Sequence, residues 1–256
     1  MDSPEFAQPN ISPAAPKGPW LFWGSMMWLG IAFIISLIAQ IGAFLLMLLP
    51  QMSAHPGMQV DIKAAAADFG VVSILLLVSY PFALAALFIA ARLRRWRWQD
   101  YFALGPISWK QFGYGFAALF ATVLTTGLIG MATGHESEPQ FMTDLFKTLR
   151  EGGNVLLLFV VIALVAPLAE ELIFRGFLFR GLAASRVGVM GAIVISSALW
   201  AVIHTQYDAF YMGVIFIIGL TFGGLRAWSG TTTLTILLHA LMNAVSFGQA
   251  WLPQSS

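Results

Sequence analysis

The stretch Val155–Phe179, VLLLFVVIALVAPLAEELIFRGFLF, decides the fold of this chain. It exceeds the roughly 20 apolar residues that a helix needs to cross a bilayer, yet it carries Glu170, Glu171 and Arg175. A charge at the bilayer centre costs about 2.5 to 3.5 kcal/mol on insertion scales, so such residues are usually functional or paired inside a bundle. The stretch therefore predicts a membrane span and a polar site on that span.

The composition of the whole chain points the same way. Of its 256 residues 59% are hydrophobic and 10% are charged, whereas a soluble domain has about 25% charged residues. We therefore expect an integral, multi-pass membrane protein in contact with the lipid bilayer. A net charge of +1 gives no field to hold a polyanion, which excludes nucleic acid as a partner. The absence of cysteine excludes disulfides and thiolate chemistry.

Other apolar segments surround the first one and predict an all-α, polytopic transmembrane helix bundle of about seven spans, between six and eight. Proline-rich residues 1–19 are expected to be a flexible tail, and residues 20–251 a single integral membrane domain. Pro81 is expected to kink the second span. The six further spans are predicted at Trp20–Leu49, Gly70–Ala91, Phe112–Ala132, Gly188–His204, Ala209–Trp228 and Thr231–Phe247.

The loop Thr133–Asn154 has a helical pattern of its own. Phe141, Leu145 and Leu149 recur at helical spacing among acidic residues that include Glu136 and Glu138. This pattern predicts a short amphipathic helix on the membrane surface.

Cationic residues set the expected orientation. Arginines between Arg92 and Arg97, with Lys110, follow the second span, and Arg180 and Arg186 follow the fourth. By the positive-inside rule both loops are cytoplasmic, so the N-terminus is predicted to be cytoplasmic. A polar cavity is expected to open on the same face, because the helical rise puts Glu170 only about 15 Å from it.

Helical spacing separates the roles of the charged residues. Glu171 and Arg175 are four residues apart and so share a helix face, whereas Glu170 is about 140° from Arg175 and has no partner on its own helix. His239 and Asn243 are also four apart and would grip one small object. His204, estimated to be about 24 Å deep, is expected to form the floor of the cavity.

Three motifs in this order resemble one known family. Glu170–Arg175 reads as E-E-x-x-x-R, Trp200–His204 as W-x-x-x-H, and His239–Asn243 as H-x-x-x-N. Together they resemble the CAAX prenyl protease and bacteriocin-processing (CPBP, or Abi) family of intramembrane proteases. The resemblance covers residues 112–249, which would form the catalytic core. Trp200 stands where the family commonly has phenylalanine.

The resemblance implies a peptidase and gives a role to each site residue. Glu170 would be the general base that activates water, assisted by His204, while His239 and Asn243 would hold the water or stabilise the oxyanion. Glu171 and Arg175 would position the helix. The substrate would be a peptide bond of a membrane-associated or lipidated protein or peptide, prenylated or not.

Alternatives stay open at this point. Glu170, His204 and His239 are ligand types that suit zinc, but the H-E-x-x-H spacing is absent, so metal-dependent and metal-free hydrolysis are both retained. A proton-coupled transporter would use Glu170 and His204 as relay groups. A non-catalytic immunity or partner protein of the same fold would need the motifs only to hold its helices together.

Overall fold

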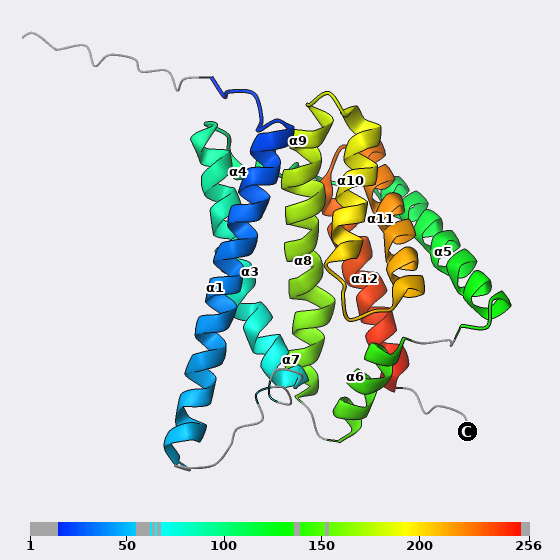
Figure 1. The fold of residues 1–256 in the computed structure, drawn as a ribbon. Coiled ribbons are helices and arrows are strands. Elements are labelled where there is room, and N and C mark those ends of the chain that lie inside the picture. The colour runs from blue at the N-terminus through cyan, green and yellow to red at the C-terminus, as the bar shows by residue number, and fades with distance from the viewer. Residues whose placement is uncertain are drawn as a thin grey trace, which may run out of the picture.

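The protein is an all-α bundle in a computed structural model that describes residues 15–54, 62, 65, 68–135, 139–151 and 154–251. Figure 1 shows long helices standing side by side, and no strand occurs in these ranges. The predicted fold class is therefore confirmed. Residues 1–14 of the predicted tail lie outside the described residues, and the domain boundaries stay predictions.

Helices α1 (Phe22–Ala54) and α3 (Phe69–Leu93) form the first pair. The indole of Trp20 donates a hydrogen bond to the carbonyl of Ala90 at 2.9 Å. Further along, the amide of Gln40 donates to the hydroxyl of Ser79 at 3.0 Å. The first bond lies just before the start of α1 and the second lies within the pair, and together they set its register.

The next segments are the short helix α4 (Trp98–Tyr101) and the long helix α5 (Trp109–Ala132). The backbone between them is tied to the distant turn before α12. The hydroxyl of Thr232 donates to the carbonyl of Phe102 at 2.7 Å, and that of Thr231 to the carbonyl of Ala103 at 3.0 Å. This loop is thereby fixed to the end of the bundle.

The predicted span at Val155–Phe179 is a continuous helix through Ala183, and it is not uniform. Two stretches of π-helix interrupt it, and Glu170 and Glu171 end the α-helical piece between them. Such wider turns often occur at functional sites. The pieces in order are α7 (Val155–Phe159), the π-helix Val160–Val165, α8 (Ala166–Glu171), the π-helix Leu172–Leu178 and α9 (Phe179–Ala183).

The last three long elements are α10 (Gly188–Val202), α11 (Ala209–Ser229) and α12 (Thr232–Trp251). Gly230 makes the tight turn between α11 and α12 with a left-handed φ of 74°. At 1.5 Å per residue α10 is only about 22 Å long, shorter than the roughly 30 Å hydrocarbon core. Its far end accordingly turns back before the end of the bundle is reached (Figure 1).

The amphipathic helix expected after α5 is present as α6 (Gln140–Arg150). Its Leu145 is fully buried and packs in a small cluster with Leu158 and Phe247. The ring of Phe141 lies 5.3 Å from that of Phe69. Glu136 and Glu138 lie outside the described residues. Helix α6 therefore packs across the end of the bundle that is opposite α4 and α9 (Figure 1).

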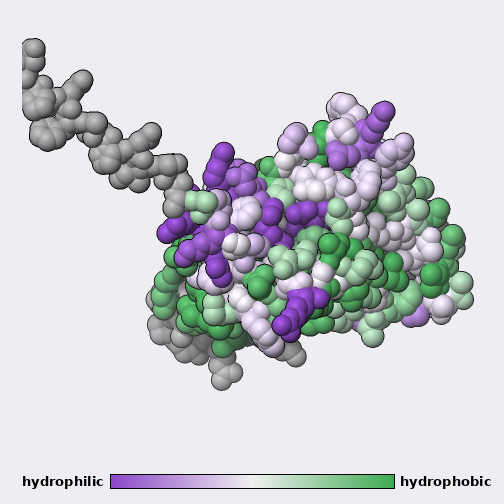
Figure 2. Space-filling model, turned by 90° about the horizontal axis from the view of Figure 1, so that it is seen from above, coloured by the Kyte–Doolittle hydropathy of each residue, from purple (hydrophilic) through white to green (hydrophobic). Residues whose placement is uncertain are grey.

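Among the described residues, five helices are long and apolar enough to cross a membrane. Large apolar side chains are exposed around the bundle, for instance Phe33 at 60% and Met190 at 71%. Figure 2 shows hydrophilic residues gathered on the end near α4 and hydrophobic ones on the flanks. The prediction of an integral membrane protein is confirmed. The five helices are Phe22–Pro50, Phe69–Leu93, Trp109–Ala132, Val155–Ala183 and Ala209–Ser229.

Two of the seven predicted spans fall outside that set. Helix α10 is apolar but too short, and α12 is a helix of 20 residues that is not among the five. All seven predicted segments are nevertheless helices at nearly the predicted positions. Five of them meet the length and composition of a membrane span, and the count of seven spans stays a prediction. Pro81 lies inside α3, as expected from its position in the sequence.

The arginine-rich end of the bundle is closed by side chains. Tyr101, Phe102 and Phe177 are fully buried there, and the rings of Tyr101 and Phe177 stack at 5.3 Å. Arg180 donates to the backbone carbonyls of Asp100 and Tyr101 above them. The expectation of a polar cavity that opens at this end is therefore wrong for the part of the chain described, because aromatic packing fills the space.

Candidate active site

Glu170 is 8% exposed and holds two hydrogen bonds from other helices. The hydroxyl of Tyr80, in α3, donates to Oε1 at 3.1 Å, and the indole N–H of Trp200, in α10, donates to Oε2 at 2.7 Å. As the spacing predicted, neither partner is on the helix of Glu170. Each carboxylate oxygen keeps a second lone pair that can accept from a water molecule.

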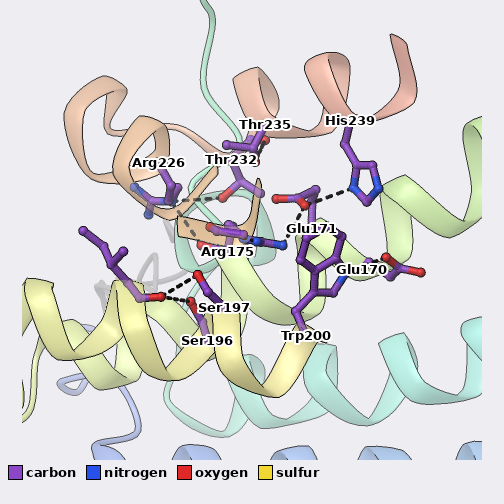
Figure 3. A network of polar contacts seen from close by, with 12 residues as sticks. Glu170, Glu171, Arg175, Ser196, Ser197, Trp200, Arg226, Thr232, Thr235 and His239 are labelled. Carbon is purple, nitrogen blue, oxygen red and sulfur yellow. Dashed lines mark hydrogen bonds and ion pairs between the residues drawn. The ribbon is translucent and has the colours of Figure 1, made fainter. Parts of the chain in front are cut away.

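Trp200 lies at the centre of the site. Its ring centroid is 5.1 Å from that of His204 and 5.3 Å from that of His239, and both imidazoles stand nearly perpendicular to the indole. With the bond to Glu170, one side chain contacts three of the four candidate catalytic groups. The structure therefore brings Glu170, His204 and His239 around the same indole, as Figure 3 shows for Glu170 and His239.

The predicted pair of Glu171 and Arg175 is confirmed. Both side chains are fully buried, and Arg175 Nη1 donates to Glu171 Oε1 at 2.9 Å. His239 Nδ1 lies 3.1 Å from the same oxygen. Burying a carboxylate destabilises the fold far less when an opposite charge is paired with it than when it is unpaired. Glu171 is thus the common acceptor for one group on its own helix and one on α12 (Figure 3).

Arg175 is also held by the backbone around it. Its Nη2 donates to the carbonyl of Gly219 at 3.2 Å, and its guanidinium lies 4.5 Å from the ring centroid of Trp200. A Cβ atom added to Gly219 would lie 2.9 Å from the Cβ of Ser197. Glycine therefore allows α11 to approach α10 closely at the level of Arg175.

A second buried arginine supports the first. Arg226 Nε donates to the carbonyl of Arg175 and to the hydroxyl of Thr232, each at 3.1 Å. Thr232 in turn donates to the carbonyl of Phe102 (Figure 3 shows Arg226 and Thr232). A Cβ on Gly176 would lie 2.8 Å from the ring of Phe102. This chain of contacts links the site to the closed end of the bundle.

Hydrogen bonding fixes the tautomers of the two histidines. His204 Nδ1 lies 2.7 Å from the carbonyl oxygen of Trp200, which only accepts, so Nδ1 carries the proton. His239 Nδ1 faces the carboxylate of Glu171, so it donates as well. When neutral, each imidazole then has its lone pair on Nε2. His204 can accept a proton at Nε2, and a protonated His239 can donate from Nε2.

His204 is at the far end of α10, away from the closed end. It is half-buried, the next residues Thr205 and Gln206 are exposed, and its ring lies 6.2 Å from that of Tyr207. Burial, with a smaller contribution from the charge of Glu170, raises the pKa of Tyr207 to about 12. His204 therefore lies at the more open end of the site, and its predicted place on the floor of a cavity is wrong.

Asn243 has a different partner from His239. Its Nδ2 donates to the carbonyl of Ile162, in the first π-helical stretch, at 2.9 Å, whereas His239 faces Glu171. The expectation that the two side chains grip one small object stays a prediction. One N–H of the Asn243 amide is still available, because the amide has two.

The described residues contain no group of three or more His, Asp or Glu side chains arranged to hold a metal ion. Glu170, His204 and His239 share contacts with Trp200, but they do not form the zinc ligand set considered from the sequence.

Three residues around the site escaped the sequence analysis. Tyr80 is in a predicted span without charges, Tyr207 is in a loop, and Arg226 is near the end of the predicted span Ala209–Trp228. The signal for Arg226 was its position inside the hydrophobic segment. Tyr80 gave only a weak signal, since a single tyrosine in a span is common at the membrane interface.

Comparisons with known proteins agree with the motif order. Residues 152–245 match the family model described as type II CAAX prenyl endopeptidase Rce1-like. The chain is 35% identical over 124 residues to an uncharacterized 24.3 kDa protein of Escherichia coli. The matched region covers 47% of this chain and 55% of that protein. It is 25% identical over 142 residues to the membrane-embedded CAAX protease MroQ of Staphylococcus aureus, covering 54% and 55%.

The chain thus spans about half the length of the curated relatives it matches. No solved structure matches it significantly. The family model includes all three motifs, from Glu170 to Asn243, and leaves out α1, α3 and α5. The resemblance is confirmed: the motif-bearing region of this membrane protein, residues 152–245, matches the model of the Rce1-like type II CAAX prenyl endopeptidase family.

Proposed function

We propose that this protein is an intramembrane endopeptidase that hydrolyses a peptide bond of a membrane-associated or lipidated substrate with a water molecule activated by Glu170. The observation that carries the proposal is the gathering of Glu170, His204 and His239 around the indole of Trp200. The family match and the MroQ relative support peptidase chemistry in general.

The reaction needs a base, an acid and an oxyanion donor. Glu170 accepts a proton from water through a free lone pair, and the water oxygen attacks the carbonyl carbon of the substrate. The resulting oxyanion accepts a hydrogen bond from Nε2 of a protonated His239 or from the amide of Asn243. The proton held by Glu170 then moves to the leaving nitrogen as the C–N bond breaks. His204 Nε2 assists by holding the water.

Glu171 and Arg175 act through these groups rather than on the substrate. Glu171 holds Nδ1 of His239, so it directs Nε2 into the site, and Arg175 compensates the charge of Glu171. In other hydrolases, too, a buried carboxylate accepts a hydrogen bond from Nδ1 of a catalytic imidazole and so orients the ring. Without the pair, Nδ1 of His239 would lose the partner that orients its ring.

The substrate reaches the site from the end of the bundle at His204. The opposite end is filled by Tyr101, Phe102 and Phe177, while Thr205 and Gln206 are exposed. With the N-terminus in the cytoplasm, as the arginines favour, this entrance is on the outer face. A short, partly apolar peptide or a lipidated chain end fits a site inside the hydrophobic core.

The test is peptide cleavage by the purified protein in liposomes. The probes are one peptide that ends in a farnesylated Cys-a-a-X sequence and the same peptide without the farnesyl group, with products read by mass spectrometry. Glu170→Gln should abolish cleavage while melting in detergent stays close to that of the unchanged protein. Glu151→Gln, on the exposed surface of the bundle, is the control and should cleave normally.

A folded Glu170→Gln variant that still cleaves would falsify the glutamate mechanism. Cleavage of only the farnesylated peptide would assign a prenylated substrate class, and equal cleavage of both would assign a peptide selected without the lipid. If neither peptide is cleaved, the peptidase proposal fails for both substrate classes.

A further inference from the structure

We propose that Tyr80 is a positioning residue for Glu170, supplied by the α1 and α3 helix pair outside the family-matched region. The inference rests on the proposed function, since it concerns how the base is held. Its starting point is one contact: Tyr80 Oη lies 3.1 Å from Glu170 Oε1. Among the described residues, Tyr80 is the hydrogen-bond donor to this oxygen.

The direction of this bond is set by chemistry. An ionised carboxylate only accepts, so the phenol of Tyr80 donates. Trp200 donates to the other oxygen, Oε2, from a helix on the other side of Glu170. One donor on each oxygen fixes the plane of the carboxylate. The second lone pair of each oxygen then points in a defined direction, which is what a base needs to meet a water molecule.

The neighbours of Tyr80 hold it at this level. Ser79 is buried and accepts a hydrogen bond from Gln40 of α1 at 3.0 Å, and Pro81 follows Tyr80 in α3. Proline removes one backbone hydrogen bond of the helix. The side-chain bond between Ser79 and Gln40 of α1 holds α3 in place beside this missing bond. The half-buried Tyr80 is thus presented to Glu170 from a helix that is itself tied to α1.

Helices α1 and α3 would thereby take part in catalysis. The matched residues 152–245 contain Glu170 and Trp200 but not Tyr80. The matched region alone would then hold Glu170 through Oε2 only, leaving the carboxyl group free to rotate about that contact. The N-terminal pair of helices would therefore contribute to turnover and not merely to anchoring.

The test compares two tyrosine-to-phenylalanine changes, Tyr80→Phe and Tyr114→Phe, on whichever of the two peptides above is cleaved. Tyr114 is on α5 and 67% exposed, so it controls for the loss of a hydroxyl. Loss of a hydrogen bond to a charged group should lower kcat by about ten- to hundredfold in Tyr80→Phe, with KM within about twofold. Tyr114→Phe should leave both constants unchanged. An unchanged kcat in a folded Tyr80→Phe protein overturns the proposal.

A second measurement does not depend on activity. Melting in detergent is recorded for Tyr80→Phe, Glu170→Leu and the double variant. If the two side chains are bonded, Tyr80→Phe should lower the melting temperature in the original background and have a smaller effect beside Glu170→Leu. Equal effects in both backgrounds overturn the contact. Coupled melting in a protein that cleaves neither peptide overturns the proposed function instead.

Discussion

Nδ1 of His239 lies 3.1 Å from Oε1 of Glu171, the oxygen that also accepts the hydrogen bond from Arg175. The second glutamate of the E-E-x-x-x-R motif is therefore the group that orients the histidine of the last motif. The first glutamate, Glu170, is left to face Trp200 and Tyr80. Two adjacent carboxylates thus receive different tasks because successive positions on a helix point in different directions.

Arg175→Ala should destabilise the protein strongly. It would leave the carboxylate of Glu171 buried without its compensating charge, a loss of about 3 to 5 kcal/mol for buried pairs in general. Thermal melting in detergent is the measurement, with Lys147→Ala as the control, because Lys147 pairs with Glu151 on the exposed surface at 3.9 Å. The control should change stability by less than about 1 kcal/mol. Unchanged melting in Arg175→Ala would show that the pair carries no stability.

Trp200→Phe and Trp200→Leu should differ. Phenylalanine keeps a ring between His204 and His239 but removes the N–H that donates to Glu170, so we expect kcat to fall by about ten- to hundredfold, as for loss of the other hydrogen bond to this carboxylate. Leucine removes the ring as well, and both imidazoles lose their packing surface. The expected order of kcat is the original protein, then Trp200→Phe, then Trp200→Leu. Equal activity in the two variants would show that the ring does not position the histidines.

Gly219→Ala should lower both stability and activity. The new Cβ would lie 2.9 Å from the Cβ of Ser197 and 3.2 Å from its Cα, and it would push away the carbonyl that accepts from Arg175. Overpacking of this kind costs about 1 to 3 kcal/mol. Gly224→Ala on the same helix is the matched control, since no atom lies within 4 Å of its added Cβ. If the two variants melt alike, the close approach of α10 and α11 does not occur.

Single cysteines will test which face the site opens to, because the chain has none of its own. Gln206→Cys, next to the proposed entrance, should react with a membrane-impermeant thiol reagent added outside intact cells. Lys110→Cys, on the arginine-rich side, should react only after the membrane is opened. Both residues are exposed. The reverse pattern would contradict the predicted orientation and would put the entrance on the cytoplasmic face.

Several features of this protein follow from the sequence alone. Long apolar runs predicted the seven long helical segments to within a few residues, because a segment in a bilayer has to satisfy its backbone hydrogen bonds internally and so becomes helical. The pairing of Glu171 with Arg175 followed from their spacing of four residues, which places both on one helix face. Glu170 is five residues from Arg175, so it points away from that face and has no partner on its own helix. Such inferences succeed because they depend only on the geometry of one helix.

Contacts between helices were decided by the tertiary structure. Asn243 bonds to the carbonyl of Ile162 while His239 faces Glu171, and Tyr80 reaches Glu170 from α3. The cationic end is closed by Tyr101 and Phe177. Charge patterns predict the side of the membrane on which a loop lies, but they carry no information on how rings fill the space beneath it. The rotation and approach of each helix depend on the packing of all its neighbours, which no local pattern encodes.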